Sequence, residues 1–180
     1  MSESKIYPVP ANFAAQANIN AAEYAQMYQQ SIDDPEGFWS EQAENYISWF
    51  KPWNSVSNWS FGEDVHIKWF EGAELNVSYN CIDRHLETRG DQIAIIWESD
   101  DPNEDRKITY NELHVEVCKF ANVLKDRGVK KGDCVSIYMP MVPETAVAMF
   151  AFTRIGATHS VAYGGFPPDA LKDRILHSDF

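Results

Sequence analysis

The feature that most constrains the fold is an alternation of short apolar runs with helix-forming stretches in the second half of the chain. Three runs have the length and the apolar composition of buried strands, at residues 93–97, 134–138 and 158–163. A helical pattern follows each run, beginning after Thr109, at residues 143–154 and at residues 167–177. Because parallel strands need a crossover connection, this β-α-β-α-β-α order predicts a parallel sheet with right-handed crossovers.

The ends of these helices carry recognisable signals. Thr109 and Glu112 have the spacing of a capping box, in which each side chain bonds the backbone amide of the other residue. Gly128 and Gly156 follow the last helical residues, where a left-handed backbone is common. Pro143 stands at the first position of its helix, where its fixed φ is already helical. These signals give the predicted helices defined limits.

The first half of the chain has a different character. One helix is predicted at residues 21–30, and a second begins with Asp34 as its N-cap and Pro35 at its first position. Residues 80–88 predict a further helix that ends at a glycine. Between them, residues 51–79 show no clear period-2 run, and they are interpreted as mostly irregular, wrapped chain.

Aromatic residues crowd the stretch from Phe38 to Phe70, which holds ten of them. One interpretation is a stacking surface for sugars or single-stranded nucleic acid. The other is the packing of an extended arm onto a larger body. Lys5 is the only basic residue before residue 51, so the cations that nucleic-acid binding needs are absent from this part. Packing is therefore the favoured interpretation.

Composition excludes several classes of function. The formal net charge of −12 argues against nucleic acid or an anionic membrane as the main partner, and the acidic segment 98–107 predicts an exposed loop. Cys81, Cys118 and Cys134 form no Cys-x-x-Cys pair, which favours reduced thiols over a disulfide framework. The sequence shows no signal-peptide pattern and no apolar run long enough for a membrane helix. We expect a cytoplasmic protein.

The most suggestive local site is the pair Gly164 and Gly165, with Phe166 after it. The pair follows a predicted strand and precedes a helix, and in open α/β sheets ligands lie beyond the carboxyl ends of strands. A helix N-terminus there would favour an anion. Neither a P-loop nor a Gly-x-Gly-x-x-Gly fingerprint is present in the sequence. A ligand site and a plain tight turn both remain open from spacing alone.

Other candidate chemistry is weak. His85 lies four residues after Cys81, but two ligands do not make a zinc site, which needs three or four. The adjacent Asp83, Arg84 and His85 point in different directions on a helix, which disfavours a catalytic triple. No Gly-x-Ser-x-Gly elbow is present. From the residues alone, none of these constellations is a candidate catalytic site, and we predict no metal ligand in this chain.

Read together, these segments resemble acetyl-CoA synthetase, of the adenylate-forming superfamily, along nearly the whole chain. The matching segments are IKWF at 67–70, NCIDRHL at 80–86, AIIWE at 94–98, YMPMVPE at 138–144, AVAM at 146–149, RIGA at 154–157, HSV at 159–161 and GGF at 164–166. The opening PAN at 10–12 and SIDDPE at 31–36 favour acetyl-CoA over propionyl-CoA synthetase.

The resemblance implies an AMP-forming acetate–CoA ligase. Such an enzyme joins acetate to the α-phosphate of ATP with the help of Mg²⁺, and coenzyme A then displaces AMP from acetyl-AMP. Of the family's functional positions, only part of the coenzyme A surface carries over, onto Tyr163, Gly164 and Gly165. Tyr163 stands where the family usually has Phe, and Pro167 stands where it usually has Ser. Tyrosine keeps the aromatic ring.

The resemblance also implies a division of the chain. Residues 1–85 would form the N-terminal wrapping region of an acetyl-CoA synthetase, and residues 86–180 the start of a truncated AMP-binding domain. The family's phosphate loop, acetate pocket and adenylation Lys would lie downstream, so the resemblance implies no catalytic residue and no ATP-binding residue in this chain. A fourth strand would follow Phe180. We therefore expect an N-terminal fragment that is inactive alone and binds none of ATP, coenzyme A and Mg²⁺ fully.

Two alternatives belong to other classes. A truncated reading frame could act as a non-enzymatic module that binds or competes with the full-length enzyme, through an exposed edge strand and the aromatic arm. A small flavodoxin-like nucleotide binder, complete in itself, is the second alternative. The missing further strands and the absence of a phosphate loop argue against the latter.

Overall fold

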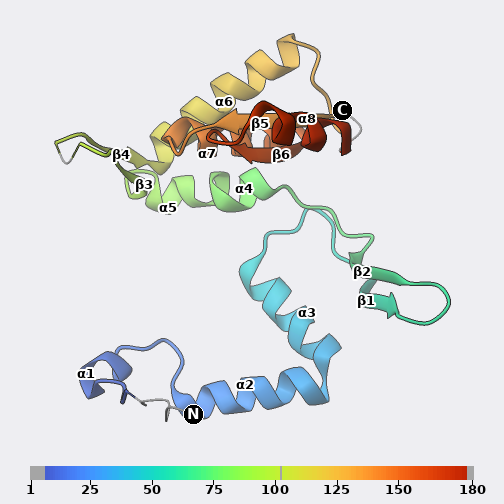
Figure 1. Ribbon diagram of the computed structural model, residues 1–180. Helices are drawn as coiled ribbons and strands as arrows, with labels where there is room; N and C mark the ends of the chain where they lie inside the picture. Colours follow the sequence, from blue (N-terminus) through green and yellow to red (C-terminus); the bar gives the residue numbers. More distant parts are fainter. Residues whose placement is uncertain (1–6, 102, 178–180) are drawn as a thin grey trace, which may run out of the picture. The chain divides into compact units, whose positions relative to one another are not determined.

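The protein is a mixed α/β chain, shown in Figure 1, and the computed structural model describes residues 7–101 and 103–177. The described residues divide into two compact units. One comprises the described part of residues 1–47 together with residues 53–72, and the other residues 48–52 together with the described part of residues 73–180. The α/β fold class predicted from the sequence is confirmed.

The first unit contains two capped helices and a hairpin. A short helix, α1 (Ala11–Ala14), precedes α2 (Ala21–Asp33) and α3 (Pro35–Tyr46), and the predictions for the latter two are confirmed. Asp34 caps α3 by accepting a hydrogen bond from the Gly37 amide at 3.0 Å. Asn20 and Glu23 form a capping box at the start of α2, which the sequence analysis did not identify.

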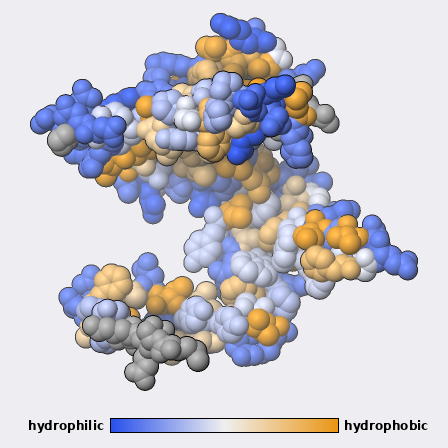
Figure 2. Space-filling view, viewed as in Figure 1, coloured by the Kyte–Doolittle hydropathy of each residue, from blue (hydrophilic) through white to orange (hydrophobic). Residues whose placement is uncertain are grey.

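The prediction of mostly irregular chain over residues 51–79 is wrong for two segments, each of which forms a strand. β1 (Ser55–Ser60) and β2 (His66–Glu71) pair as an antiparallel hairpin. Only Val56 of these two strands is buried, so neither strand has the buried face that would impose a period-2 pattern on its sequence. Figure 2 shows hydrophobic residues gathered over this hairpin, and Ile67 and Trp69 of β2 are exposed.

The second unit begins with a broken helix where one helix was predicted at residues 80–88. α4 (Val77–Cys81), a 3₁₀ turn η1 (Asp83–His85) and α5 (Leu86–Arg89) follow one another. The break lies at Ile82, whose φ of −125° and ψ of −67° are not helical and whose side chain is fully buried. Burial of this side chain in the core offsets the loss of a continuous helix.

The prediction of three parallel strands is only partly right. β3 (Ile93–Glu98) forms where a strand was expected, but it pairs antiparallel with β4 (Asp105–Thr109). Of the exposed loop predicted at residues 98–107, residues 99–101 and 103–104 do lie in the connection between these strands, whereas residue 98 and residues 105–107 belong to the strands themselves. β4 begins with Asp105, Arg106 and Lys107, and exposed, charged strand residues are indistinguishable from loop residues in a sequence.

The parallel sheet that positions the candidate site consists of β5 (Cys134–Met139) and β6 (Thr158–Tyr163). α7 (Pro143–Ile155) connects them, and α6 (Tyr110–Asp126) packs against α7. α8 (Pro168–His177) follows β6. The buried core of this unit joins the sheet to both helices, and it consists of Ile82, Leu113, Val117, Ala121, Leu124, Ile137, Ala148, Ala151, Phe152 and Ala157.

The helix ends in this unit confirm the signals in the sequence. The Thr109 hydroxyl accepts a hydrogen bond from the Glu112 amide at 3.2 Å, and the Glu112 carboxylate accepts one from the Thr109 amide at 2.8 Å. Gly156 ends α7 with φ of 78°, and Gly128 has φ of 89° two residues after α6. Both glycines thus adopt the left-handed conformation that other residues rarely adopt.

A partly buried ion pair joins η1 to the end of α7. The Arg154 guanidinium donates two hydrogen bonds of 2.7 Å to the Asp83 carboxylate, one to each oxygen. His114 Nε2 on α6 lies 3.4 Å from Asp83 Oδ1, and the Asn76 amide donates to the Arg154 carbonyl at 3.2 Å. The side chains of Asp83 and Arg154 are 18% and 26% exposed. Two-point pairing of this kind fixes orientation as well as distance.

The pair makes a prediction for acid stability. The hydrogen bonds from Arg154 lower the pKa of Asp83 below its ordinary value of 3.8, against the opposing effect of burial. The pair therefore stabilises the fold fully above about pH 4, and this contribution is lost as the pH falls through the lower pKa of the folded state. Urea unfolding at pH 6 and pH 3 should show a smaller loss of stability in Asp83→Asn than in the unsubstituted chain. Equal losses in both proteins would contradict the prediction.

Candidate functional site

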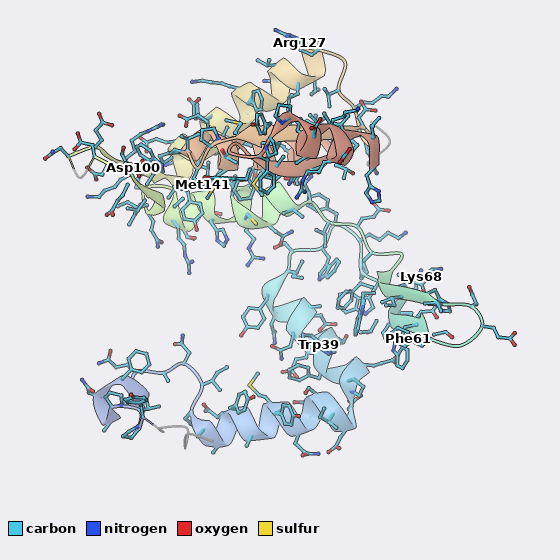
Figure 3. The ribbon with its side chains drawn as sticks, viewed as in Figure 1. Trp39, Phe61, Lys68, Asp100, Arg127 and Met141 are labelled. Atoms are coloured by element: carbon cyan, nitrogen blue, oxygen red, sulfur yellow. The ribbon has the colours of Figure 1, made fainter. Side chains whose placement is uncertain are left out.

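The segment Tyr163, Gly164 and Gly165 lies at the carboxyl end of β6, on the wall of a cavity of about 580 Å³. Three chain segments form this cavity, and each follows or ends a strand. They are the end of β3 with the turn after it (Trp97, Glu98, Ser99, Asp100), the loop after β5 (Pro140, Met141, Val142) and the end of β6 with the two glycines. Figure 3 shows Asp100 and Met141 at this same end of the unit.

Gly164 is in close contact with the loop after β5. A Cβ atom at Gly164 would lie 3.1 Å from both the Met139 carbonyl carbon and the Pro140 nitrogen, which are backbone atoms. At Gly165 the nearest atom to such a Cβ would be in the Tyr163 ring, which is a movable side chain. Neither glycine has a positive φ. Close backbone approach, and not turn geometry, is the reason that position 164 is glycine.

Three side chains hold the loops on either side of this contact. The Trp97 indole Nε1 donates a hydrogen bond of 2.9 Å to the Met141 carbonyl, and the Tyr138 hydroxyl donates one of 2.9 Å to the Phe166 carbonyl. The Thr145 hydroxyl donates a third, at 2.8 Å, to the Pro140 carbonyl. Both loops of the cavity are therefore tied to strands or to the start of α7.

The residues that line the cavity include two aromatic side chains, Trp97 and Tyr163, and none of these lining residues is a cation. The Tyr163 ring is 57% exposed and meets the Phe166 ring edge-on, with the centroids 5.8 Å apart. Glu98 and Asp100 are the charged residues among those that line the cavity. The Arg174 guanidinium lies 5.4 Å from the centre of the Phe166 ring. The cavity suits an uncharged, planar group better than a phosphate.

A second cavity of about 680 Å³ has the opposite character. Lys125, Lys130, Lys131 and Arg154 line it, at the C-terminal ends of α6 and α7. Figure 3 labels Arg127, which follows α6 at this end. The carbonyl groups at a helix C-terminus carry partial negative charge, so these cations complement the two helices.

Among the residues that the structure describes, no group of three or more His, Cys, Asp and Glu side chains could hold a metal ion. Cys81 and His85 remain the pair noted in the sequence. The same spacing recurs in His114 and Cys118, which the sequence analysis overlooked, and there Cys118 Sγ lies 3.4 Å from His114 Nε2. The His114 imidazole also contacts both residues of the Asp83–Arg154 ion pair. In the described part of the chain, no helix is long and apolar enough to cross a membrane.

Sequence reasoning identified the glycines but missed Trp97, Met141 and Tyr138. A usable signal existed, because the three predicted strands end at residues 97, 138 and 163, and the carboxyl ends of neighbouring strands meet at one edge of a sheet. The structure brings these ends together around one cavity, although β3 is not hydrogen-bonded to β5 or β6.

Two protein families match adjoining parts of the chain. Residues 24–81 match the family described as acetyl-coenzyme A synthetase N-terminus, and residues 82–180 match the family described as AMP-binding enzyme. The acetyl-coenzyme A synthetases of Magnetococcus marinus and Vibrio cholerae are 64% and 58% identical to this chain over 179 and 180 residues. Each alignment covers 99% of this chain and 28% of the relative, so the chain spans about a quarter of the length of these proteins.

A solved structure agrees with these matches. Acetoacetyl-CoA synthetase from Streptomyces lividans is similar with a TM-score of 0.77 and 28% identity, over 91% of this chain and 25% of that one. The resemblance stated from the sequence motifs is confirmed. Because the AMP-binding match alone takes in more than half of the 180 residues, and an acetyl-coenzyme A synthetase N-terminal match adjoins it, the chain belongs to the AMP-binding enzyme family.

Proposed function

We propose that this chain is the N-terminal part of an acetate–CoA ligase, which makes acetyl-CoA from acetate, ATP and coenzyme A through acetyl-AMP. The observation that carries the proposal is the 64% identity over 179 residues to a protein named acetyl-coenzyme A synthetase. The adjoining match to the acetyl-coenzyme A synthetase N-terminus supports the same substrate. The reaction belongs to the assembled ligase, in the cytoplasm, with Mg²⁺ to neutralise phosphate charge.

Within this ligase we assign Tyr163, Gly164 and Gly165 to the surface that contacts coenzyme A. The exposed Tyr163 ring offers an aromatic face, and the glycine backbone is not shielded by side chains of its own. The cavity wall carries Glu98 and Asp100. The phosphates of coenzyme A therefore need cations from outside this wall, and the three residues serve the uncharged part of the ligand.

We propose that the catalytic residues of the ligase lie outside this chain. Residues 1–85 act as the wrapping region and residues 86–180 as the beginning of the AMP-binding domain. ATP, acetate and Mg²⁺ are bound mainly by other parts of the ligase, so the 180-residue chain alone is inactive. A non-enzymatic module that binds the full-length enzyme is the alternative, and the exposed hydrophobic residues of the hairpin, such as Ile67 and Trp69, would be its contact surface.

A chimera tests the proposed function. The first 179 aligned residues of the Magnetococcus marinus acetyl-coenzyme A synthetase are replaced by this chain, which is 64% identical to them. We expect the chimera to catalyse acetate-dependent exchange of pyrophosphate into ATP and to form acetyl-CoA, because 64% of the exchanged residues are identical in the two proteins. The 180-residue chain alone should do neither.

The controls separate the two proposals. The same relative without its N-terminal segment should be inactive, and adding the free chain to it tests assembly without a peptide link. A folded chimera that forms no acetyl-AMP would contradict the ligase proposal. Inhibition of the intact relative by the free chain, together with their co-purification, would favour the non-enzymatic module.

A further inference from the structure

We propose that Trp97 and Tyr138 are positioning residues that hold the two loops of the coenzyme A surface in register. Neither residue belongs to the glycine segment, and both act through backbone carbonyl groups. The inference rests on the proposed function, because it concerns the same surface and states what fixes its shape.

Gly164 is in contact with the loop after β5. The backbone of this residue lies so close to Met139 and Pro140 that a Cβ atom would meet their backbone atoms at 3.1 Å, a tighter contact than most Cβ atoms make. The position of the glycine segment is therefore set by the loop after β5. Any movement of that loop shifts the backbone that would face the ligand.

The second step is the anchoring of that loop from its far side. Val142 donates to the Pro140 carbonyl at 2.9 Å, which makes a tight turn, and Met141 at its tip is 78% exposed. An exposed tip has little packing to hold it. The hydrogen bond from Trp97 to the Met141 carbonyl connects the tip to the end of β3, across 44 residues of sequence.

The third step concerns the opposite side of the glycines. Phe166 donates to the Tyr163 carbonyl at 3.0 Å, which closes a turn around Gly164 and Gly165. The Tyr138 hydroxyl donates a hydrogen bond of 2.9 Å to the Phe166 carbonyl. Tyr138 lies next to Met139 in the chain, so β5 holds the glycine turn at both of its ends.

The two bonds share one geometry. Each runs from a ring at the end of a strand to a carbonyl group in a neighbouring loop, and each partner is at least partly exposed. Such bonds add little to global stability, since water competes for both groups. Their contribution is the orientation of the loops, and their loss should alter ligand affinity more than folding.

The functional test uses Trp97→Phe and Tyr138→Phe in the active chimera. Each substitution keeps a ring and removes one donor, so the Michaelis constant for coenzyme A should rise about threefold to tenfold. The Michaelis constant for coenzyme A should be higher in the double variant than in either single variant. The Michaelis constant for ATP should change less than about twofold, because pyrophosphate exchange does not involve this surface. Equal changes for ATP and coenzyme A would overturn the proposal.

Matched controls come from the first unit. Trp59→Phe and Tyr24→Phe make the same chemical changes at exposed residues whose recorded partners are other rings, Phe61 and Tyr28. Both variants should have a Michaelis constant for coenzyme A within about twofold of that of the unsubstituted chimera. If the Michaelis constant for coenzyme A rises as much in these controls as in Tyr138→Phe, the effect does not come from the positioning of the two loops.

A second measurement decides the inference even if the chimera is inactive. Hydrogen–deuterium exchange in the 180-residue chain reports on the amides of Val142 and Phe166, which close the two turns. Trp97→Phe should speed exchange at residues 139–142, and Tyr138→Phe at residues 163–166, each by about threefold or more. Unchanged exchange in both segments would overturn the proposal, whereas an inactive chimera would count only against the ligase function.

Discussion

Replacing Arg154 with alanine is expected to lower the free energy of unfolding by about 2–3 kcal/mol. The substitution leaves the Asp83 carboxylate, which is 18% exposed, without the two hydrogen bonds that satisfy its oxygens. The estimate lies at or below the lower end of the range for a fully buried pair, because water still reaches both side chains. Urea unfolding followed by circular dichroism measures the change.

A second ion pair provides the control. Arg106 and Glu144 are 2.6 Å apart, which is shorter than the Arg154–Asp83 distance, but both side chains are about half exposed, at 51% and 52%. Arg106→Ala should therefore cost no more than about 1 kcal/mol. If the two alanine variants lose the same stability, burial is not the reason for the effect. A double-mutant cycle of Asp83→Ala with Arg154→Ala would then measure the coupling directly.

Replacing Gly164 with valine is expected to raise the Michaelis constant for coenzyme A in the chimera by about thirtyfold or more. A Cβ atom already meets backbone at 3.1 Å, and the two methyl groups of valine add to this overlap. Overpacking of about 2 kcal/mol corresponds to this factor, because each 1.4 kcal/mol is tenfold in affinity. Steady-state assays with varied coenzyme A measure it.

Gly165 supplies the contrast for this prediction. An added Cβ atom there meets the exposed Tyr163 ring, which can rotate away, and no backbone is forced to move. Gly165→Ala should therefore raise the constant by a smaller factor than Gly164→Ala. An equal loss of pyrophosphate exchange and of acetyl-CoA formation in Gly164→Val would mean that the substitution damages the whole fold and not this surface.

The most accurate sequence predictions depend on local chemistry. The Thr109 capping box, the start of α3 at Pro35 and the end of α7 at Gly156 all lie where the sequence placed them. A cap or a left-handed glycine acts over three or four residues, so its signal is complete within the sequence. The candidate glycine segment was found for a similar reason, because it follows a strong strand pattern.

The wrong predictions depend on partners that are distant in the sequence. β4 was interpreted as loop because its charged residues are exposed, and only pairing with β3 makes it a strand. The helix predicted at residues 80–88 breaks at Ile82 because that side chain is drawn into a core built largely from α6 and α7. Propensity is a weak effect beside the burial of a large apolar side chain.

By itself, the sequence determined the class of the fold, the start of α3 at Pro35, the start of α6 after Thr109, the end of α7 at Gly156 and, through its motifs, the family. These properties reside in neighbouring residues or in ordered segments, which a single chain displays directly. Only the tertiary structure decided that β3 turns back on β4, that Asp83 meets Arg154, and that Trp97 reaches the loop after β5. The physical reason is that such contacts join residues far apart in the chain, and their geometry is set by the packing of the intervening elements.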